Sequence, residues 1–574
     1  MIGRRSATAV LAAVLAGIVW LAFFRFSGEF GLYEDDYAAV TPALEWSGAE
    51  LWEAAGWHFR HAGVMHGRPL HYPFIFALSF LGNAIGGLAG IYGVGWAVVT
   101  LNGVLFYLLL HRVSGSAAVA SAGALGFALF PADTTRAFLT HSLGIQPSLT
   151  ALIAALYLHV SGRRIWSFVA ASLCLFLYEV PYLLFLAAPL LRWPWGRGFP
   201  RRLMVHAVLV AAILAAAVGW RAWSAEQRVA GLNWSSAVVH AARNTLIGPW
   251  VAWRETVSRC VDGLWRQLAA YPWEVAAAWL LGAAALYWSA RTAPRAPGGG
   301  KGGDPSTNQC AEPAGMKKRE RLWLAAAGVA LLALAYPLTL TLAATETAGR
   351  ATRVHVATPV GAGIIAGCLF GPFVARPRPG LRRLLAACGV SLLLVAGAAG
   401  AGLRVQADYR EAWQYQRAFW TDVLRLCPDA GAGTVIVVDY QNIKGPRDAS
   451  VMGWHILLGL KSLFRLPSGW DPPPVLSNLG WDWRQRCSEG RPLAEYVDWK
   501  GFGSEVSGPY RAANHIWLDI EGGRLRRREG EHTIAGRTFR FLLRGEPVLP
   551  DLPRRPLYQY LILRPGETGA AYAW

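Results

Sequence analysis

Charged residues are scarce in this sequence. Asp, Glu, Lys and Arg make up only 16% of its 574 residues, whereas hydrophobic residues make up 54%. Soluble domains carry about 25% charged residues, so the composition excludes a purely soluble enzyme and a disordered protein. Long apolar blocks recur from Ala9 to Leu403 and are absent from residues 403–574. The pattern predicts a polytopic membrane protein with a soluble C-terminal tail.

Cysteine is also rare, with seven residues in the whole chain. They form no CxxC pair and show no Cys/His metal-ligand spacing, which argues against a disulfide scaffold. Cys427 and Cys487 both lie in the tail, and they could pair if the tail is outside the cytoplasm. A dinucleotide-binding fingerprint is missing too, because no GxGxxG follows the apolar run GTVIVVD at residues 433–439.

The strongly basic balance is not a nucleic-acid signal. The formal net charge is +19, and the tail, with 23 basic and 19 acidic residues, contributes only +4 of it. The other +15 is spread over many short loops of the membrane half. A nucleic-acid-binding protein gathers its basic residues on one face, so we predict no nucleic-acid partner.

Membrane spans need about 20 mostly apolar residues each. The stretch 70–90 is apolar, but Pro73, Asn83 and several glycines interrupt it, and we interpret it as interfacial or re-entrant. Eleven spans are then predicted, at about 7–25, 91–110, 115–131, 144–160, 165–178, 180–191, 203–222, 272–290, 322–343, 358–375 and 384–402.

The loops between these spans sort by charge. One alternate set holds 20 basic and 3 acidic residues, and the other, without the tail, holds 11 basic and 14 acidic residues. Cytoplasmic loops carry the excess of Lys and Arg, which predicts a multi-pass protein of the cytoplasmic (inner) membrane with a cytoplasmic N-terminus. An odd number of spans places the tail outside the cytoplasm. The Gly/Pro-rich basic stretch 291–321 is then a cytoplasmic linker.

The predicted fold class is mostly α, a transmembrane helical bundle followed by a small α/β extracytoplasmic domain. We expect three parts: a membrane module at 1–225, a second membrane module at 226–402 and the soluble domain at 403–574. The first module contains the outer loop 26–90. The second contains the outer loops 226–271 and 344–358. In the tail we predict helices at 406–426 and 455–466, and strands at 433–439, 538–545 and 557–564.

An acidic triplet, Glu34, Asp35 and Asp36, follows the first span in the stretch GLYEDDYAAV. Clustered carboxylates raise one another's pKa, so one of them could act as a general base toward an acceptor hydroxyl. Such carboxylates could also hold a divalent cation, Mg²⁺ or Mn²⁺. Asp35 and Asp36, with Asp133 of the next outer loop, are the candidate ligands for such an ion.

Several other polar residues stand in the outer loops. Arg68 has the planar fork that binds phosphate bidentately. In the second outer loop, Asp133 could orient an acceptor and Arg136 could contact phosphate, with His141 beside them. Glu179 interrupts an apolar stretch, where an acid is costly unless it is paired or lines a cavity.

The late outer loop ATETAGRATRVHVATP carries two arginines, Arg350 and Arg353, at positions i and i+3. That spacing places them on one helical face, where they could clamp a departing phosphate and offset its developing charge. His355 follows in the same loop and is a further candidate for substrate binding.

These motifs together resemble the GT-C superfamily of membrane glycosyltransferases, which includes the protein O-mannosyltransferases and the lipid A aminoarabinose transferase. The acidic pair after span one, RPL at 68–70 before a non-spanning segment, FALFP at 127–131 closing span three, and Glu179 between two short spans carry the resemblance. It covers about residues 5–225 and is weaker to 402.

The resemblance implies transfer of a sugar from a polyprenyl-phosphate or polyprenyl-diphosphate carrier to a glycan, lipid or protein acceptor. Such transfer takes place on the outer face of the membrane, usually with inversion. It also implies that Asp35 or Asp36 is the catalytic base, without separating the two, and that Arg350 or Arg353 binds the carrier phosphate.

Three other functions stay open. A transporter or flippase would carry its charged residues at mid-membrane positions, whereas here they cluster in outer loops. A non-catalytic scaffold of envelope glycan assembly would not need the acidic triplet. An O-antigen ligase or polymerase would use basic residues of large outer loops instead of an aspartate after the first span.

Overall fold

The computed structural model describes residues 2–61, 67–192, 195–224, 226, 233–291, 316–375, 380–438, 445–449, 459–478, 514–521, 524–534 and 536–567. By its contacts the chain forms two compact units. The first, the helical unit, comprises residues 1–28 and 48–406, and the second, the tail unit, comprises residues 29–47 and 407–574. The units cut across the three predicted ranges, because 29–47 joins the tail.

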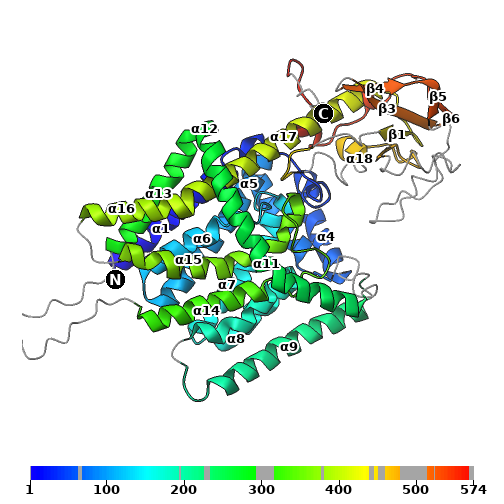
Figure 1. Cartoon of the computed structure of the whole chain (residues 1–574). Helices are drawn as coiled ribbons and strands as arrows, with labels where there is room; N and C mark the ends of the chain where they lie inside the picture. Colours follow the sequence, from blue (N-terminus) through cyan, green and yellow to red (C-terminus); the bar gives the residue numbers. More distant parts are fainter. Residues whose placement is uncertain are drawn as a thin grey trace, which may run out of the picture. The chain divides into compact units, whose positions relative to one another are not determined.

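The helical unit is built almost wholly of helices (Figure 1). In chain order its α-helices are α1 (Ile2–Val19), α4 (Gly48–Arg60), α5 (His71–Ser114), α6 (Ala117–Ala128), α7 (Gln146–Val160), α8 (Arg164–Leu177), α9 (Phe199–Trp223), α11 (Trp234–Asp262), α12 (Leu268–Ala270), α13 (Pro272–Arg291), α14 (Lys318–Leu334), α15 (Thr358–Ala375), α16 (Gly380–Ser391) and the first part of α17 (Gly397–Leu426), whose residues from 407 onward belong to the tail unit. Shorter 3-10 or π turns are η1 (Trp20–Phe24), η2 (Ser27–Glu29), η3 (His141–Ile145), η4 (Tyr182–Leu191), η5 (Gly263–Gln267), η7 (Gly349–His355) and η8 (Leu392–Ala396).

Among the described residues, six helical stretches are long and apolar enough to cross a membrane, which confirms a mostly helical fold and agrees with a multi-pass membrane protein. Each contains or overlaps one of the predicted spans. They are Thr8–Glu29, His71–Ser114, His141–Val160, Phe199–Trp223, Thr358–Ala375 and Gly380–Leu426. Three shorter apolar helices, Ala117–Ala128, Arg164–Leu177 and Tyr182–Leu191, lie where further spans are predicted.

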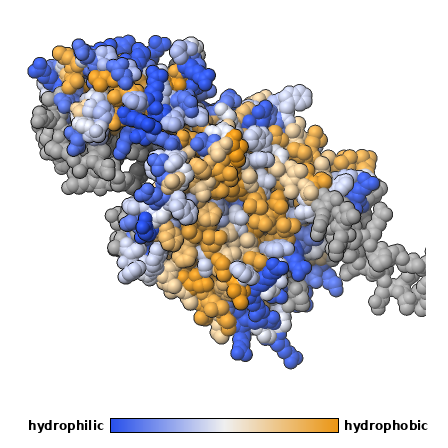
Figure 2. Space-filling view, turned by 180° about the vertical axis from the view of Figure 1, so that it is seen from behind, coloured by the Kyte–Doolittle hydropathy of each residue, from blue (hydrophilic) through white to orange (hydrophobic). Residues whose placement is uncertain are grey.

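Apolar side chains also cover the outside of this unit. Figure 2 shows hydrophobic residues gathered over a broad area of its surface. Ile165, Val208 and Leu246 are 80%, 61% and 80% exposed. Exposed patches of this extent are unusual on soluble proteins, and a bilayer would cover them.

Small residues bring α6 and α15 into close contact in the middle of the unit (Figure 1). A Cβ added at Gly367 would lie 2.6 Å from the Val119 carbonyl oxygen, and one at Gly123 would lie 2.8 Å from the Gly363 carbonyl oxygen. Membrane helices pack closely where small residues let their backbones approach. The two helices therefore form a tight central pair.

The stretch 70–90 is helical but broken. The backbone of α5 leaves helical geometry at Gly86 and Gly87, and Gly87 takes a φ of +60°, which favours glycine. A Cβ at Gly90 would lie 2.1 Å from the Gly82 carbonyl oxygen. The two legs of α5 thus meet closely at the break, and only glycine fits there.

The tail unit holds a mixed sheet of strands β1 (Val435–Val438), β2 (Val475–Asn478), β3 (His515–Glu521) and β4 (Arg524–Arg528), in the order β2-β1-β3-β4. β1 pairs in parallel with β2 and β3, and β4 runs antiparallel to β3. β5 (Gly530–Ile534) and β6 (Arg537–Phe541) form a separate antiparallel pair. The short helices are α2 (Asp36–Ala39), α3 (Thr41–Glu45), α18 (Gly459–Leu463), α20 (Tyr558–Leu561) and the 3-10 turn η12 (Leu549–Asp551).

The tail predictions have mixed outcomes. The strand at 433–439, the strand at 538–545 and the helix at 406–426 are confirmed by β1, β6 and α17. The strand predicted at 557–564 is wrong, because that stretch contains α20. Its two fully buried leucines, Leu557 and Leu561, are four residues apart, a spacing that places them on one side of a helix. Cys487 lies outside the described residues, so its pairing with Cys427 stays a prediction.

Candidate functional site

An ion-pair group joins three distant parts of the helical unit. Arg68 donates to Glu179 twice, from Nε to Oε2 at 2.8 Å and from Nη2 to Oε1 at 2.6 Å. Arg221, at the end of α9, donates to Glu179 Oε2 at 3.2 Å and to the Gly67 carbonyl at 3.2 Å. The three side chains are only 13–17% exposed. Glu179, the acid that interrupts an apolar stretch, is therefore paired with two arginines, which offsets the cost of its charge there.

Local sequence explains how these side chains reach one another. Arg68 stands just before α5, Glu179 lies in the break between α8 and η4, and Arg221 lies in the last turn of α9. The Arg68 guanidinium also stacks over the Tyr178 ring at 4.3 Å. Burial alone would raise the pKa of Glu179, but Arg68 and Arg221 hold it well below its ordinary value. Glu179 is thus a fixed anion that orients two cations.

His141 lies beside this ion-pair group in a cationic environment. Arg353, Arg350, His71 and Arg68 all interact electrostatically with its ring. The His141 side chain is 3% exposed, and neither ring nitrogen has a hydrogen-bond partner among the described residues. Buried polar groups are normally satisfied, so two unpartnered ring nitrogens indicate a place for a ligand.

His71 can approach η3 closely because residue 144 is glycine. A Cβ at Gly144 would lie 2.5 Å from His71 Cε1, so a larger residue would displace the imidazole. Residues from the predicted outer loop 26–90, the second outer loop and the late outer loop 344–358, together with Glu179, therefore belong to one group. We call Arg68, His71, His141, Glu179, Arg350 and Arg353 the polar cluster.

The second predicted outer loop and the late outer loop 344–358 are joined directly. The Thr134 amide donates to Thr352 Oγ1 at 3.2 Å, and the two hydroxyls lie 2.9 Å apart. Asp133, 1% exposed, accepts the amide and hydroxyl of Thr135 on Oδ1. Its Oδ2 has no hydrogen-bond partner among the described residues, and burial raises the pKa of this carboxyl. Asp133 thus stabilises the loop through hydrogen bonds to Oδ1 alone.

Two predicted site residues have structural partners. Arg136 is buried and donates to the carbonyls of Phe127 and Ala128 at the end of α6, the geometry of a basic helix C-cap. His355 is fully buried, with Nδ1 2.9 Å from Tyr336 Oη and Nε2 3.1 Å from the Glu346 carbonyl. Burial lowers the pKa of His355 to about 4, so the ring is neutral at pH 7. Their substrate contacts stay predictions.

The predicted outer loop 226–271 contains the 29-residue helix α11, whose inner side supports the arginine loop. Asn244 donates to the carbonyls of Thr339 and Leu342 and accepts the Ala344 amide. Arg259 donates to the Thr347 carbonyl at 2.7 Å. Neither these supporting residues nor Arg221 could be recognised in the sequence, because none belongs to a recognisable motif.

The acidic triplet belongs to the tail unit. Glu34 has a positive φ of 46°, an uncommon conformation that is often found at functional sites. Asp36 is fully buried, and its Oδ2 accepts the Tyr33 amide at 3.3 Å. Asp35 is partly exposed. Of the two predicted bases, Asp35 is therefore the one that solvent reaches.

This loop is fixed to the tail-unit part of α17. The Tyr33 hydroxyl donates to the Tyr409 carbonyl at 2.8 Å, and the Tyr37 hydroxyl donates to Gln416 Oε1 at 2.6 Å. A Cβ at Gly31 would lie 1.9 Å from the Trp413 ring, so only glycine allows the contact. The acidic motif is consequently rigidly held.

Among the described residues, no group of three or more His, Cys, Asp or Glu side chains is arranged to hold a metal ion. The polar cluster is instead rich in arginine and imidazole. Arginine binds phosphate through charge-assisted, often bidentate hydrogen bonds. The arrangement is thus suited to binding an anion. Compared with known protein families, curated proteins and solved structures, the chain matches none.

Proposed function

We propose that this chain is a GT-C-type membrane glycosyltransferase that transfers a sugar from a polyprenyl-phosphate-linked donor to a glycan, lipid or protein acceptor. The observation that carries the proposal is the polar cluster, with the buried and unpartnered His141 among Arg68, Arg350 and Arg353. Such a cluster would bind the donor phosphate. The apolar surface of the same unit suits a donor that arrives through the bilayer.

The proposal also includes a membrane topology. The chain has eleven spans, with its N-terminus in the cytoplasm and its tail outside, as loop charge predicts. Reaction on the outer face follows from the same assignment.

In the proposed mechanism, Arg350 and Arg353 bind the phosphate of the carrier, and Glu179 keeps Arg68 oriented toward the same anion. Asp35 or Asp36 takes the proton from an acceptor hydroxyl, whose oxygen attacks the anomeric carbon. The bond between that carbon and the phosphate oxygen breaks, and polyprenyl phosphate leaves with its charge stabilised by the arginines. Attack opposite the leaving group inverts the anomeric centre.

The test is turnover of a panel of polyprenyl-phosphate sugars by the purified full chain. We expect one donor to be active, and loss of the base, in Asp35→Asn or Asp36→Asn, to lower kcat by about 10²- to 10⁴-fold while the donor still binds. Asp262→Asn is the matched control, because Asp262 is an exposed carboxylate paired with Arg266. It should match the wild type.

The arginines give a separate readout. Arg350→Gln combined with Arg353→Gln should weaken donor binding by about tenfold or more, as expected for lost hydrogen bonds to a charged group. If no donor binds to the wild type, the transporter and scaffold functions gain support. If both aspartate variants keep full activity, the transferase stands and the assigned base is wrong.

A further inference from the structure

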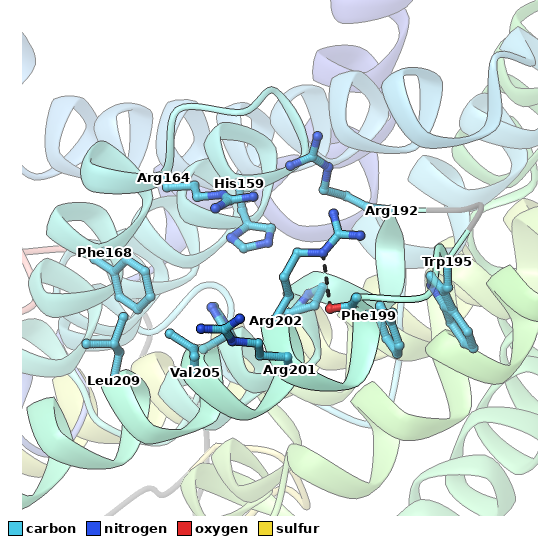
Figure 3. A pocket seen from close by; sticks show the side chains of 13 residues that line it. His159, Arg164, Phe168, Arg192, Trp195, Phe199, Arg201, Arg202, Val205 and Leu209 are labelled. Carbon is cyan, nitrogen blue, oxygen red and sulfur yellow. Dashed lines mark hydrogen bonds between the residues drawn. The ribbon is translucent and has the colours of Figure 1, made fainter.

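A second cationic site lies away from the polar cluster, in a cavity of about 690 Å³. The cavity forms where α7 ends, α8 begins, η4 ends and α9 begins. Figure 3 shows its lining, with the side chains of Arg164, Arg192 and Arg202 around that of His159.

The lining carries a strong positive charge. Arg164, Arg192, Arg201 and Arg202 contribute four guanidinium groups, all of them on exposed residues, and no acidic side chain is among the described lining residues. Four like charges around one hollow repel one another, and an anion in the cavity would relieve that repulsion. The preference of arginine for phosphate oxygens points to a phosphate group.

A buried histidine gives independent evidence for a ligand. His159 is 7% exposed, and its Nδ1 has no hydrogen-bond partner among the described residues. Its neighbour His206, whose ring lies 4.9 Å away, is instead fixed by a contact of 2.8 Å between Nε2 and the Phe185 carbonyl. A histidine that lines the cavity therefore has one ring nitrogen with no hydrogen-bond partner among the described residues.

One side of the cavity is apolar and open. Val205 and Leu209 of α9 are 51% and 46% exposed, and Phe168 of α8 lies next to them in Figure 3. Val208, 61% exposed, lies beside Leu209 on the exposed surface of α9. A free phosphate would use only the arginines, whereas a lipid would also cover these side chains.

The helices place this cavity at the opposite end of α7, α8 and α9 from the polar cluster. The stretch His141–Val160, 20 residues long, has His141 at one end and His159 at the other, which separates them by about 27 Å at 1.5 Å per residue. α9 begins at the cavity and carries Arg221 of the ion-pair group in its last turn. α8 likewise begins at Arg164 and ends next to Tyr178.

We propose that this cavity binds the phosphate headgroup of an anionic membrane lipid, on the membrane face opposite the polar cluster. The four arginines and His159 hold the phosphate, and Phe168, Val205 and Leu209 contact the start of the acyl chains. The site is independent of the proposed transferase activity. It anchors the start of α9 to the bilayer surface.

The test is equilibrium binding of short-chain lipids to the purified full chain in a neutral detergent. The probes are dihexanoyl phosphatidic acid, dihexanoyl phosphatidylcholine and inorganic phosphate. We expect phosphatidic acid to bind about tenfold or more tightly than either of the others. Arg192→Gln combined with Arg202→Gln should weaken phosphatidic acid binding by about tenfold or more.

Matched variants keep the result interpretable. Arg112→Gln combined with Arg382→Gln removes the same charge from exposed residues outside the cavity and should leave binding unchanged. Phe168→Ala should weaken phosphatidic acid but not inorganic phosphate. Equal binding of phosphatidylcholine, or equal loss in both arginine pairs, overturns the proposal. Equal binding of inorganic phosphate and phosphatidic acid overturns the lipid assignment and leaves a free-phosphate site.

Discussion

At the residue scale, Glu179 has the most consequential environment in the helical unit. It accepts hydrogen bonds from Arg68 and Arg221, whose side chains are 13% and 14% exposed, against 17% for Glu179. Removing one partner of a buried ion pair leaves the other charges uncompensated, which costs about 3 kcal/mol or more. Glu179→Gln should therefore lower the midpoint of thermal unfolding of the purified protein by several degrees.

The control for this change is Glu274→Gln. Glu274 pairs with Arg25 at 3.9 Å, and the Arg25 side chain is 47% exposed, so the pair is worth at most about 1 kcal/mol. A shift in the control as large as that in Glu179→Gln would mean that the ion-pair group does not stabilise the unit.

Asp429 has a comparable role in the tail unit. Its carboxylate receives Arg527 Nη1 at 2.5 Å, Arg527 Nη2 at 2.9 Å and the Gly545 amide at 2.7 Å, and both side chains of the pair are 1–2% exposed. Asp429→Asn should cost about 3 kcal/mol, measured by chemical unfolding of the full chain. Asp422→Asn, at an exposed pair with Arg425, should cost less than about 1 kcal/mol.

The same pair predicts a pH dependence. Burial would raise the pKa of Asp429, but the hydrogen bonds from Arg527 and Gly545 hold it below its ordinary value. A lowered pKa gives stability that is complete above the unfolded-state value of about 4 and is lost as the pH falls below it. The difference in stability between wild type and Asp429→Asn should thus be constant from pH 7 to 5 and shrink below about pH 4. A difference that grows on acidification would contradict the assignment.

At the element scale, the contact between α6 and α15 allows a clean comparison of two glycines. A methyl group at Gly367 would press on the Val119 carbonyl, whereas a Cβ at Gly389 of α16 meets no atom within 4 Å. Overpacking of a tight contact costs about 1–3 kcal/mol, while alanine is favoured over glycine in an open helix by about 1 kcal/mol.

We therefore expect Gly367→Ala to lower the unfolding midpoint and Gly389→Ala to leave it unchanged or raise it slightly. Thermal unfolding of both variants in one detergent measures the two effects side by side. If Gly367→Ala is as stable as Gly389→Ala, the two helices are not in backbone contact in the folded protein.

At the scale of the whole molecule, the number of spans decides where the tail lies. The six long apolar helices alone would return the chain to the side on which it began, whereas the eleven proposed spans place the tail on the other side. Reporter fusions in a bacterial host distinguish these two topologies. Alkaline phosphatase fused after residue 574 should be active and a fluorescent protein there dark, and the reverse should hold for fusions inside the linker 291–321. Phosphatase activity of the linker fusion would mean that the chain has the reverse of the proposed topology.

The acidic motif, although it lies near the start of the sequence, belongs to the tail unit. Residues 29–47 follow the first membrane helix in sequence, yet they are packed with the tail through Tyr33, Tyr37 and Gly31. Another tail contact is the hydrogen bond of 2.7 Å from Arg555 to Glu45. The loop that carries the predicted base is thus shaped by residues almost 400 positions later in the chain.

The sequence alone predicted a mostly helical chain with long apolar segments, a C-terminal part with mixed helix and strand, strands β1 and β6, and five of the six residues of the polar cluster. These features could be predicted because they depend on the order of neighbouring residues. An apolar run or a β-branched stretch favours its helix or strand wherever the segment is buried. Three features became visible only in the folded chain: Arg68 and Arg221 neutralise Glu179, Arg136 caps α6, and the acidic loop joins the tail unit. These contacts depend on which loops the packed helices bring together. The partners of Glu179 lie 42 and 111 positions away in the chain, so no pattern of neighbouring residues predicts the ion pairs.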